Sequence, residues 1–147
     1  MKELFCDHLH AYRKSIIWLK RSYERCQGLE SDALSEEDIE KLETFAARFS
    51  RSVDILINKL LRSLDMAELE DTTRKLDTVI RAEKRGFVES YEELIELKNL
   101  RNELAHEYIE ELFLEKVLLV KEASKKLFAI TDAIEAYLKR YDLCGES

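Results

Sequence analysis

The sequence predicts an all-α protein, folded as one antiparallel bundle of four to five helices. The first observation is composition: the 147 residues include no proline and only 3 glycines, while leucine, glutamate, lysine and alanine are abundant. This composition favours helix almost throughout. The second is periodicity, because apolar residues recur every three or four positions along most of the chain. A chain of this length can bury a substantial core, so we expect a single domain over 1–147.

The first helix is expected from Lys2 to about Gln27, where Gly28 supplies a C-terminal stop. Trp18 lies beside its apolar stripe and either extends the core or covers an interface. The stripe consists of Phe5, Leu9, Tyr12, Ile16, Leu19, Tyr23 and Cys26.

The second helix is expected to begin at Ser35, which forms a capping box with Asp38. Its apolar stripe extends to Leu64, so the helix spans about 40 Å, a length typical of the spine of a bundle. Polar residues line its flanks, and the sequence does not indicate which of them face the fourth helix. They are Arg48, Arg51, Asp54, Asn58 and Lys59.

A third, shorter helix follows a break over 65–70, with Asp71 or Thr72 as its N-cap and Gly86 as its end. Phe87 and Val88 are expected to fold back onto the core.

Two helices complete the bundle. Ser90 and Glu93 form a second capping box that opens a fourth helix over about 91–105. After a short corner over 108–111, a long fifth helix carries apolar residues as far as Tyr141. The tail over about 143–147 is expected to fray.

Cysteine and histidine usage predicts neither a disulfide framework nor a metal site. Cys6, Cys26 and Cys144 are odd in number and widely spaced. Cys6 and His10 share a helix face, but His8 points elsewhere and no further ligand set accompanies them. The sequence has no apolar run of the roughly 20 residues that span a membrane and no signal-peptide pattern. We therefore expect a cytoplasmic protein without a membrane partner or a cofactor.

The formal net charge of −7 gives the chain no overall attraction for nucleic acid. Local charge matters more than the total, and two helices carry basic clusters. These are Arg13, Lys14, Lys20, Arg21 and Arg25 in the first helix and Arg74, Lys75, Arg81, Lys84 and Arg85 in the third. Either cluster alone is best interpreted as a solvated helix face.

The fourth helix carries the candidate site. At about 100° per residue, Arg101 falls within the apolar arc of this helix, and Asn102 and His106 lie one turn apart at its edge. A guanidinium among apolar neighbours is costly unless it is paired or lines a polar cleft. Taken singly, Arg101 fits a snorkelling or paired side chain, and His106 fits a C-terminal cap.

Together these residues form a recognisable motif. The run Arg-Asn-Glu-Leu-Ala-His-Glu-Tyr over 101–108 resembles the Arg-x4-His-x-Tyr motif of HEPN-domain proteins. Within that family it is most similar to HepT-type toxins, which are encoded beside minimal nucleotidyltransferase antitoxins. The resemblance covers most of the chain, because the motif lies near the end of the fourth of several helices and a long helix follows. It implies a HEPN-like bundle that acts as a ribonuclease toxin.

The residue types suit metal-independent cleavage of RNA, with Arg101, Asn102 and His106 as the catalytic residues. An imidazole with a pKa near about 6.5 can take the proton of a ribose 2′-hydroxyl or return one to the leaving oxygen. A guanidinium matches phosphate oxygens bidentately and can stabilise the phosphorane transition state. Asn102 would orient the imidazole or hold the phosphate. The expected product is a 2′,3′-cyclic phosphate.

Helix geometry predicts a homodimer. Arg101 and His106 lie about 140° apart around an ideal helix, so one straight helix cannot easily direct both at one phosphate. Either the helix ends before His106 and the chain turns the imidazole back, or a second copy completes the site. The second alternative agrees with the resemblance, since HEPN domains commonly form such dimers.

The resemblance also implies a role for Tyr108, the motif tyrosine that accepts AMP from the partner nucleotidyltransferase in HepT-type toxins. Added phosphates beside Arg101 would occupy the anion site and repel RNA. The alternative function is a non-catalytic helical binding partner, the substrate-binding subunit of a nucleotidyltransferase, which the acidic net charge fits better. A purely structural dimer would leave the motif unexplained.

Overall fold

The computed structural model describes residues 1–29, 33–106 and 109–145, with the backbone alone described for 109–114. Every regular element in these ranges is helical, which confirms the all-α prediction. The elements in chain order are α1 (Lys2–Arg25), α2 (Glu36–Asp54), the π-helix η1 (Ile55–Leu60), α3 (Leu61–Ala67), α4 (Lys75–Lys84), α5 (Glu92–His106) and α6 (Ile109–Arg140).

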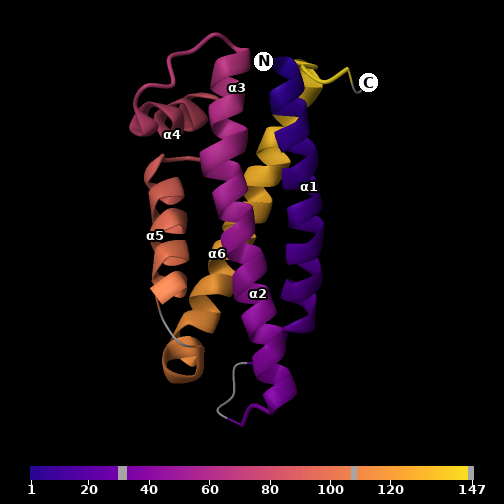
Figure 1. Ribbon diagram of the computed structural model, residues 1–147, viewed down its shortest axis with the longest axis vertical. Coiled ribbons are helices and arrows are strands. Elements are labelled where there is room, and N and C mark those ends of the chain that lie inside the picture. Colours follow the sequence, from indigo (N-terminus) through magenta and orange to yellow (C-terminus); the bar gives the residue numbers. More distant parts are fainter. Residues whose placement is uncertain (30–32, 107–108, 146–147) are drawn as a thin grey trace.

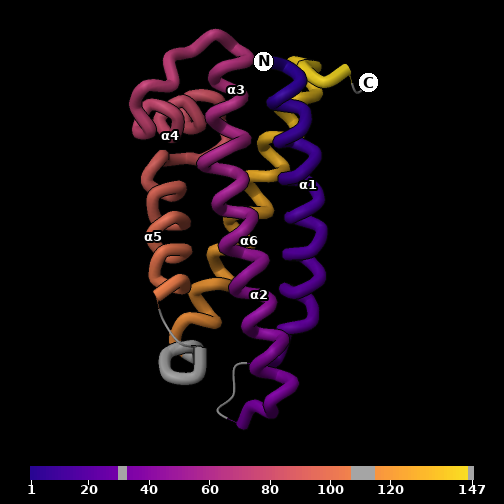
Figure 2. Tube along the Cα trace, in the orientation of Figure 1, coloured from indigo at the N-terminus to yellow at the C-terminus, as the bar shows by residue number. Residues whose placement is uncertain are grey.

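The helices form one antiparallel bundle (Figure 1). The elements α2, η1 and α3 follow one another without interruption and form a single long rod, which is continuous in Figure 2. The rod packs between α1 and α5, and α6 packs against α1 and α2. The short helix α4 lies across the end of the bundle beside α3, near both chain termini. None of the helices, as far as the chain is described, combines the length and the apolarity needed to cross a bilayer.

The predicted starts and stops are largely confirmed, although α6 already begins at Ile109, where a corner was expected. The side chain of Ser35 accepts a hydrogen bond from the Asp38 amide, and the Asp38 carboxylate accepts one from the Ser35 amide, as a capping box requires. The Glu93 carboxylate accepts a hydrogen bond from the Ser90 amide in the same way. Gly28 and Gly86 adopt φ values of +82° and +85°, a left-handed conformation that ends a helix at little cost only for glycine.

Two boundaries around the predicted break differ from the structure. The helix α3 continues through Asp65 to Ala67, because the Asp65 side chain is buried against α4 and is not a solvated helix end. The next helix begins after Arg74, so the predicted caps Asp71 and Thr72 are wrong. Asp71 instead accepts hydrogen bonds from the amide and hydroxyl of Thr73, and this local turn competes with helix initiation.

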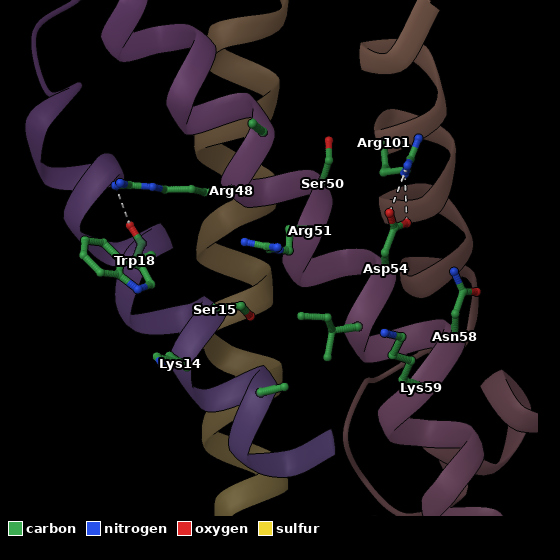
Figure 3. Close-up of a pocket in the computed structure, with 13 residues that line it drawn as sticks. Lys14, Ser15, Trp18, Arg48, Ser50, Arg51, Asp54, Asn58, Lys59 and Arg101 are labelled. Atoms are coloured by element: carbon green, nitrogen blue, oxygen red, sulfur yellow. Dashed lines mark hydrogen bonds and ion pairs between the residues drawn. The ribbon is translucent and has the colours of Figure 1, made fainter. Parts of the chain in front are cut away.

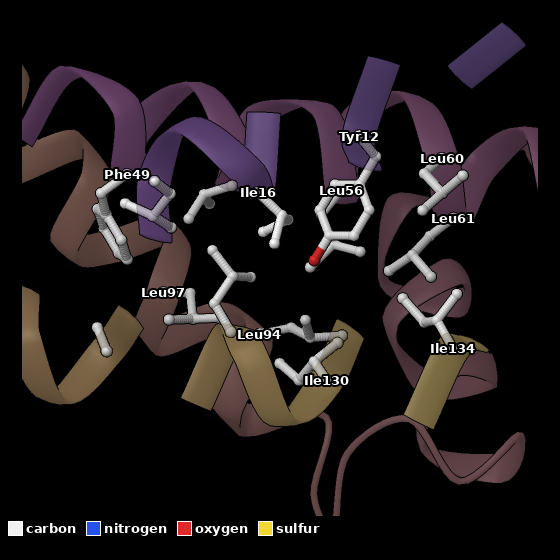
Figure 4. Packing of buried hydrophobic residues seen from close by; sticks show 14 of the residues in the cluster. Tyr12, Ile16, Phe49, Leu56, Leu60, Leu61, Leu94, Leu97, Ile130 and Ile134 are labelled. Atoms are coloured by element: carbon white, nitrogen blue, oxygen red, sulfur yellow. The ribbon is translucent and has the colours of Figure 1, made fainter. Parts of the chain in front are cut away.

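The predicted apolar stripes meet in one core (Figure 4). The residues predicted to fold back, Phe87 and Val88, are buried in it. A few polar groups inside the bundle are satisfied: the Tyr12 hydroxyl forms a 2.8 Å hydrogen bond with Thr131 of α6. Burial raises the pKa of Tyr12 well above its ordinary value, so this hydroxyl stays protonated and neutral.

The cysteine prediction is wrong. Cys6 of α1 and Cys144, which follows α6, form a disulfide with a Cα–Cα distance of 5.7 Å. The bond joins residues 138 positions apart, and only the folded bundle brings the two chain ends together, so their spacing gave no signal. Leu143 and Cys144 also pack against the core, so the chain is held beyond the position where fraying was expected to begin. Cys26 is a buried free thiol, and burial raises its pKa.

Candidate functional site

The arginine of the motif is held by a carboxylate from the neighbouring helix. Arg101 of α5 donates from Nε to Oδ1 of Asp54 at 2.8 Å and from Nη2 to Oδ2 at 2.9 Å. This bidentate pair lies at the end of α2 and is partly exposed, with 30% of the arginine side chain and 38% of the aspartate side chain accessible. The pair explains how a guanidinium is tolerated on the apolar arc of α5.

The pair fixes the guanidinium without using all of its donors. Nε and one N–H of Nη2 point at Asp54, which leaves the two N–H groups of Nη1 and the second N–H of Nη2. The hydrogen bond to Asp54 is the main cause that raises the pKa of Arg101, so the side chain keeps its charge. The arrangement therefore presents a permanent cation whose outer edge can receive a phosphate.

Arg101 lies at one side of an open groove of about 1020 Å³ between α1, the α2–η1 segment of the rod and α5 (Figure 3). Small side chains leave space for this groove where α1 meets α2, and Ser52 hydrogen-bonds Ser15 behind it at 3.0 Å. The lining residues are Ala11, Lys14, Ser15, Trp18, Ala47, Arg48, Ser50, Arg51, Asp54, Ile55, Asn58, Lys59 and Arg101. We call this surface the Trp18 groove.

The lining of the Trp18 groove is strongly cationic. Five lysine and arginine side chains line it, and Asp54 supplies the single carboxylate among the described lining residues. That carboxylate is already paired with Arg101, so it does little to neutralise the others. In Figure 3, Arg101 lies on one side and Lys14 on the other, with Arg51 between them and Arg48 directed towards Trp18.

Trp18 stands at the end of the groove remote from Arg101. Its side chain is 41% exposed, and the guanidinium carbons of Arg21 and Arg48 lie 4.6 Å and 4.9 Å from its ring centroid. Arg48 also donates to the Ser22 hydroxyl at 2.8 Å. Desolvation, followed by the nearby charges of Arg25 and Arg21, lowers the pKa of Arg48, which shows that cations are crowded here.

The other predicted site residues lie elsewhere on α5 or outside the described ranges. Asn102 and His106 are exposed, and neither lines the Trp18 groove. The helix continues through His106, so the chain does not turn the imidazole back towards Arg101 within the same helix. Of the two alternatives drawn from the sequence, the first is therefore excluded. Tyr108 lies outside the described residues.

The two basic clusters predicted from the sequence are used differently in the fold. In the first, Arg13 is bound by Glu135 of α6 at 2.8 Å, and only Lys14 lines the Trp18 groove. In the second, Arg81 and Arg85 turn inwards and hold Asp65. Contiguity in sequence was thus a poor guide to the cations of the Trp18 groove, which come from α1, the rod and α5.

The histidine and cysteine pattern near the N-terminus does not form a metal site. Cys6 is in the disulfide, and Nδ1 of His8 lies 3.0 Å from the Ser63 hydroxyl and 3.1 Å from the Lys59 carbonyl oxygen. Within the part of the chain that the structure describes, no three His, Cys, Asp or Glu side chains are placed to hold a metal ion.

Asp54 is the site residue that sequence reasoning missed. It was recognised as polar on the flank of the second helix, but the pattern did not indicate that it faces α5. The π-helix η1, which begins directly after Asp54, adds to the difficulty because it changes which residues share a face. The one available signal was Arg101 itself, since an arginine on an apolar arc requires an acidic partner on a neighbouring helix.

Comparison with known proteins adds no assignment: no protein-family model, no curated protein and no solved structure matches this chain.

Proposed function

We propose that the protein is a metal-independent RNA endonuclease, the toxin of a toxin–antitoxin pair of the HepT type. The observation that supports this most directly is the placement of Arg101, fixed by Asp54 at the side of a cation-lined groove, as the first residue of an Arg-x4-His motif. A charged guanidinium with free outer N–H groups beside a basic groove is suited to bind a scissile phosphate.

A second copy of the chain supplies the histidine. Because α5 is helical from Arg101 through His106, the two side chains of one protomer diverge by about 140°. Apolar surface is available beside the motif: Leu118 and Leu119 of α6 are 57% and 51% exposed, and they lie within a turn of Lys116, which binds Glu103 of α5 at 2.7 Å. Such surface favours a symmetric dimer that brings two motif helices together.

In the proposed reaction, His106 of one protomer accepts the proton of the ribose 2′-hydroxyl. The 2′-oxygen attacks the adjacent phosphorus, and the bond from phosphorus to the 5′-oxygen breaks as that oxygen receives a proton from water. The imidazolium of His106 then returns its proton to the hydroxide that remains. Arg101 stabilises the extra negative charge of the phosphorane. Asn102 is one turn from His106 and can orient the imidazole. The products are a 2′,3′-cyclic phosphate and a 5′-hydroxyl.

A partner nucleotidyltransferase completes the proposal. It would transfer AMP to the hydroxyl of Tyr108, two positions after His106 in the motif. The added phosphates compete for Arg101 and repel the RNA backbone, so the modification silences the nuclease without unfolding it.

Induced expression tests the nuclease activity directly. We expect wild type to arrest growth and to produce cellular RNA ends with 2′,3′-cyclic phosphate, and Arg101→Ala and His106→Ala to lower cleavage by about 10²- to 10⁴-fold. His10→Ala is the matched control, because His10 is an exposed histidine on α1 outside the groove. The nuclease proposal fails if wild type and the motif variants are equally harmless although abundant and folded.

A second prediction concerns the carboxylate that holds Arg101. Asp54→Asn keeps the shape of the side chain but loses the charge-assisted bidentate pair, so the guanidinium is free to reorient. We expect kcat to fall about 10- to 100-fold with a small change in KM, because a misplaced transition-state group costs rate more than binding. Circular dichroism should show an unchanged helical fold. A normal kcat would show that Asp54 does not position Arg101 for the reaction.

One observation favours the alternative, a non-catalytic binding partner of a nucleotidyltransferase. Arg101 is already ion-paired with Asp54, and His106 is not directed at Arg101. Each protomer alone therefore has a phosphate-binding groove without an adjacent base. In that case purified wild type binds the partner enzyme but leaves RNA intact, and the motif variants behave like wild type in the expression test.

A further inference from the structure

Eight cationic side chains in the described part of this acidic protein line two adjoining grooves. A second groove of about 530 Å³ lies between the rod, α4 and α5, and it meets the Trp18 groove at Asn58, which lines both. The second groove adds Arg62, Lys75 and Lys98 and, among its described lining residues, no carboxylate. Together the two grooves expose eight cations against one carboxylate, in a chain with 24 basic and 31 acidic residues.

Within the described ranges, several of these cations form no ion pair that would stabilise the fold. The side chains of Lys14, Arg51 and Lys59 are exposed, and they make no ion pair or hydrogen bond with any residue that the structure describes. A solvated helix face usually mixes both signs of charge. Cations that lie close together without partners repel one another, and this repulsion destabilises the fold. A bound polyanion removes the repulsion.

The spacing of these groups fits a nucleic-acid backbone. From Arg48 to Lys59 the rod advances on the order of 15 Å, which corresponds to about four or five stacked nucleotides at ~3.4 Å each. Trp18 adds a partly exposed aromatic ring at the far end, and because Arg21 and Arg48 lie over this ring, a nucleotide there would meet an aromatic edge and two guanidinium groups together. Lysines and arginines in a row, with an aromatic ring beside them, are typical of grooves that bind single strands.

We propose that the two grooves form one track for single-stranded RNA, which runs past Lys14, Arg51 and Lys59 and brings a phosphate to Arg101. This inference rests on the proposed function, because it names the substrate class of that same site. The cations of the track bind phosphates without reading sequence, and Trp18 contacts a base or ribose at the end remote from Arg101. The acidic remainder of the surface repels RNA and so confines it to the track.

The chain offers a built-in probe of this track, because Trp18 is its single tryptophan. Titration of a ten-nucleotide single-stranded RNA into the His106→Ala protein, which keeps the RNA intact, should quench or shift the Trp18 fluorescence. For single strands the logarithm of the binding constant falls with the logarithm of salt concentration by about 0.7 per phosphate contact. Each cation removed should therefore reduce this slope by about 0.7.

Arg51→Gln and Lys59→Gln, each made in the His106→Ala protein, test the track. We expect each to reduce the salt slope by about 0.7. Over a tenfold range of salt concentration, a slope smaller by about 0.7 corresponds to about fivefold weaker binding at the low-salt end, here 0.1 M. Arg140→Gln is the matched control: it removes one exposed cation from the end of α6, outside both grooves, and should leave the slope unchanged.

The outcomes separate the track from the nuclease. If the groove variants bind RNA like the His106→Ala parent protein, or if Arg140→Gln weakens binding as much, the track is wrong while cleavage by wild type still supports the nuclease. If poly-glutamate or duplex RNA quenches Trp18 as effectively as the single strand, the surface is a general polyanion site and the proposal is overturned. If the predicted slopes are found but wild type cleaves nothing, the track stands and the nuclease fails.

Discussion

On the proposed function, mixing the Arg101→Ala and His106→Ala proteins is expected to restore RNA cleavage to about a quarter of the wild-type level, because half of the randomly mixed dimers would carry both variants and each of these would have one complete Arg101–His106 pair. Against the homodimers of either variant, whose loss is about 10²- to 10⁴-fold, this is an increase of about 25- to 2,500-fold. Few other experiments give so large an effect from material that is inactive on its own.

The expectation follows from the geometry of α5. Arg101 is turned towards Asp54 and the groove, and five residues of uninterrupted helix place His106 on a different side. If cleavage requires both side chains at one phosphate, they must come from different protomers. A mixed dimer then holds the intact Arg101 of one chain opposite the intact His106 of the other.

The experiment needs dimers that exchange subunits or that are assembled together. Co-expression with two affinity tags and sequential purification isolates the mixed dimer, whose cleavage rate is compared with that of the tagged homodimers. A mixture of Arg101→Ala with the Arg101→Ala/His106→Ala double variant is the control and should stay inactive. Absence of any restoration in a verified mixed dimer would mean that the site lies within one protomer.

Local sequence rules predicted the helices well because each rule acts over a few residues. The Ser35–Asp38 and Ser90–Glu93 pairs start helices, and Gly28 and Gly86 end them, through hydrogen bonds and backbone conformations within one turn. The same rules failed where a contact with a residue distant in the sequence determines where a helix ends. Asp65 was expected to lie in a break between helices, but it is buried within α3 and binds arginines that lie 16 and 20 positions further along the chain.

The basic surface escaped prediction for a related reason. Its cations come from α1, the rod, α4 and α5, and no two of them that are adjacent in the sequence line the same groove. The sequence showed clusters in the first and third helices, but the fold uses part of those clusters for ion pairs. The motif on α5, by contrast, was visible because the chemistry of Arg101 and His106 is local to one helix.

Asp65→Ala is expected to lower the free energy of unfolding by about 3–5 kcal/mol, because it leaves two buried arginine charges without their carboxylate. Asp65 is fully buried, and its carboxylate accepts from Arg81 at 3.0 Å and from Arg85 at 2.7 Å. Arg85 also binds Glu68 at 3.1 Å, and Glu68 accepts from the hydroxyl of Tyr137 on α6 at 2.8 Å. The network thereby ties α4 to the rod and to α6.

The charges of this network depend on one another. Burial disfavours the charged form of Arg81, but the hydrogen bond and charge of Asp65 outweigh this effect and raise the pKa of Arg81. Arg85, with 10% of its side chain exposed, has even less access to water. Without Asp65, the ion pairs that remain to these two arginines within the described ranges are the longer 3.6 Å pair of Arg81 with Glu70 and the pair of Arg85 with Glu68, so α4 is the element expected to loosen first.

Urea unfolding followed by circular dichroism measures the loss, which corresponds to a fall in melting temperature of roughly 10–15 °C for a chain of this size. Glu122→Ala is the matched control, because it removes the carboxylate of an exposed pair with Lys125 and should cost less than about 1 kcal/mol. Replacing Asp65, Arg81 and Arg85 together by leucine or methionine should recover most of the stability, since an apolar cluster needs no counter-charge. A triple variant as unstable as Asp65→Ala would show that the ion network itself stabilises the fold, and not merely that breaking it is costly.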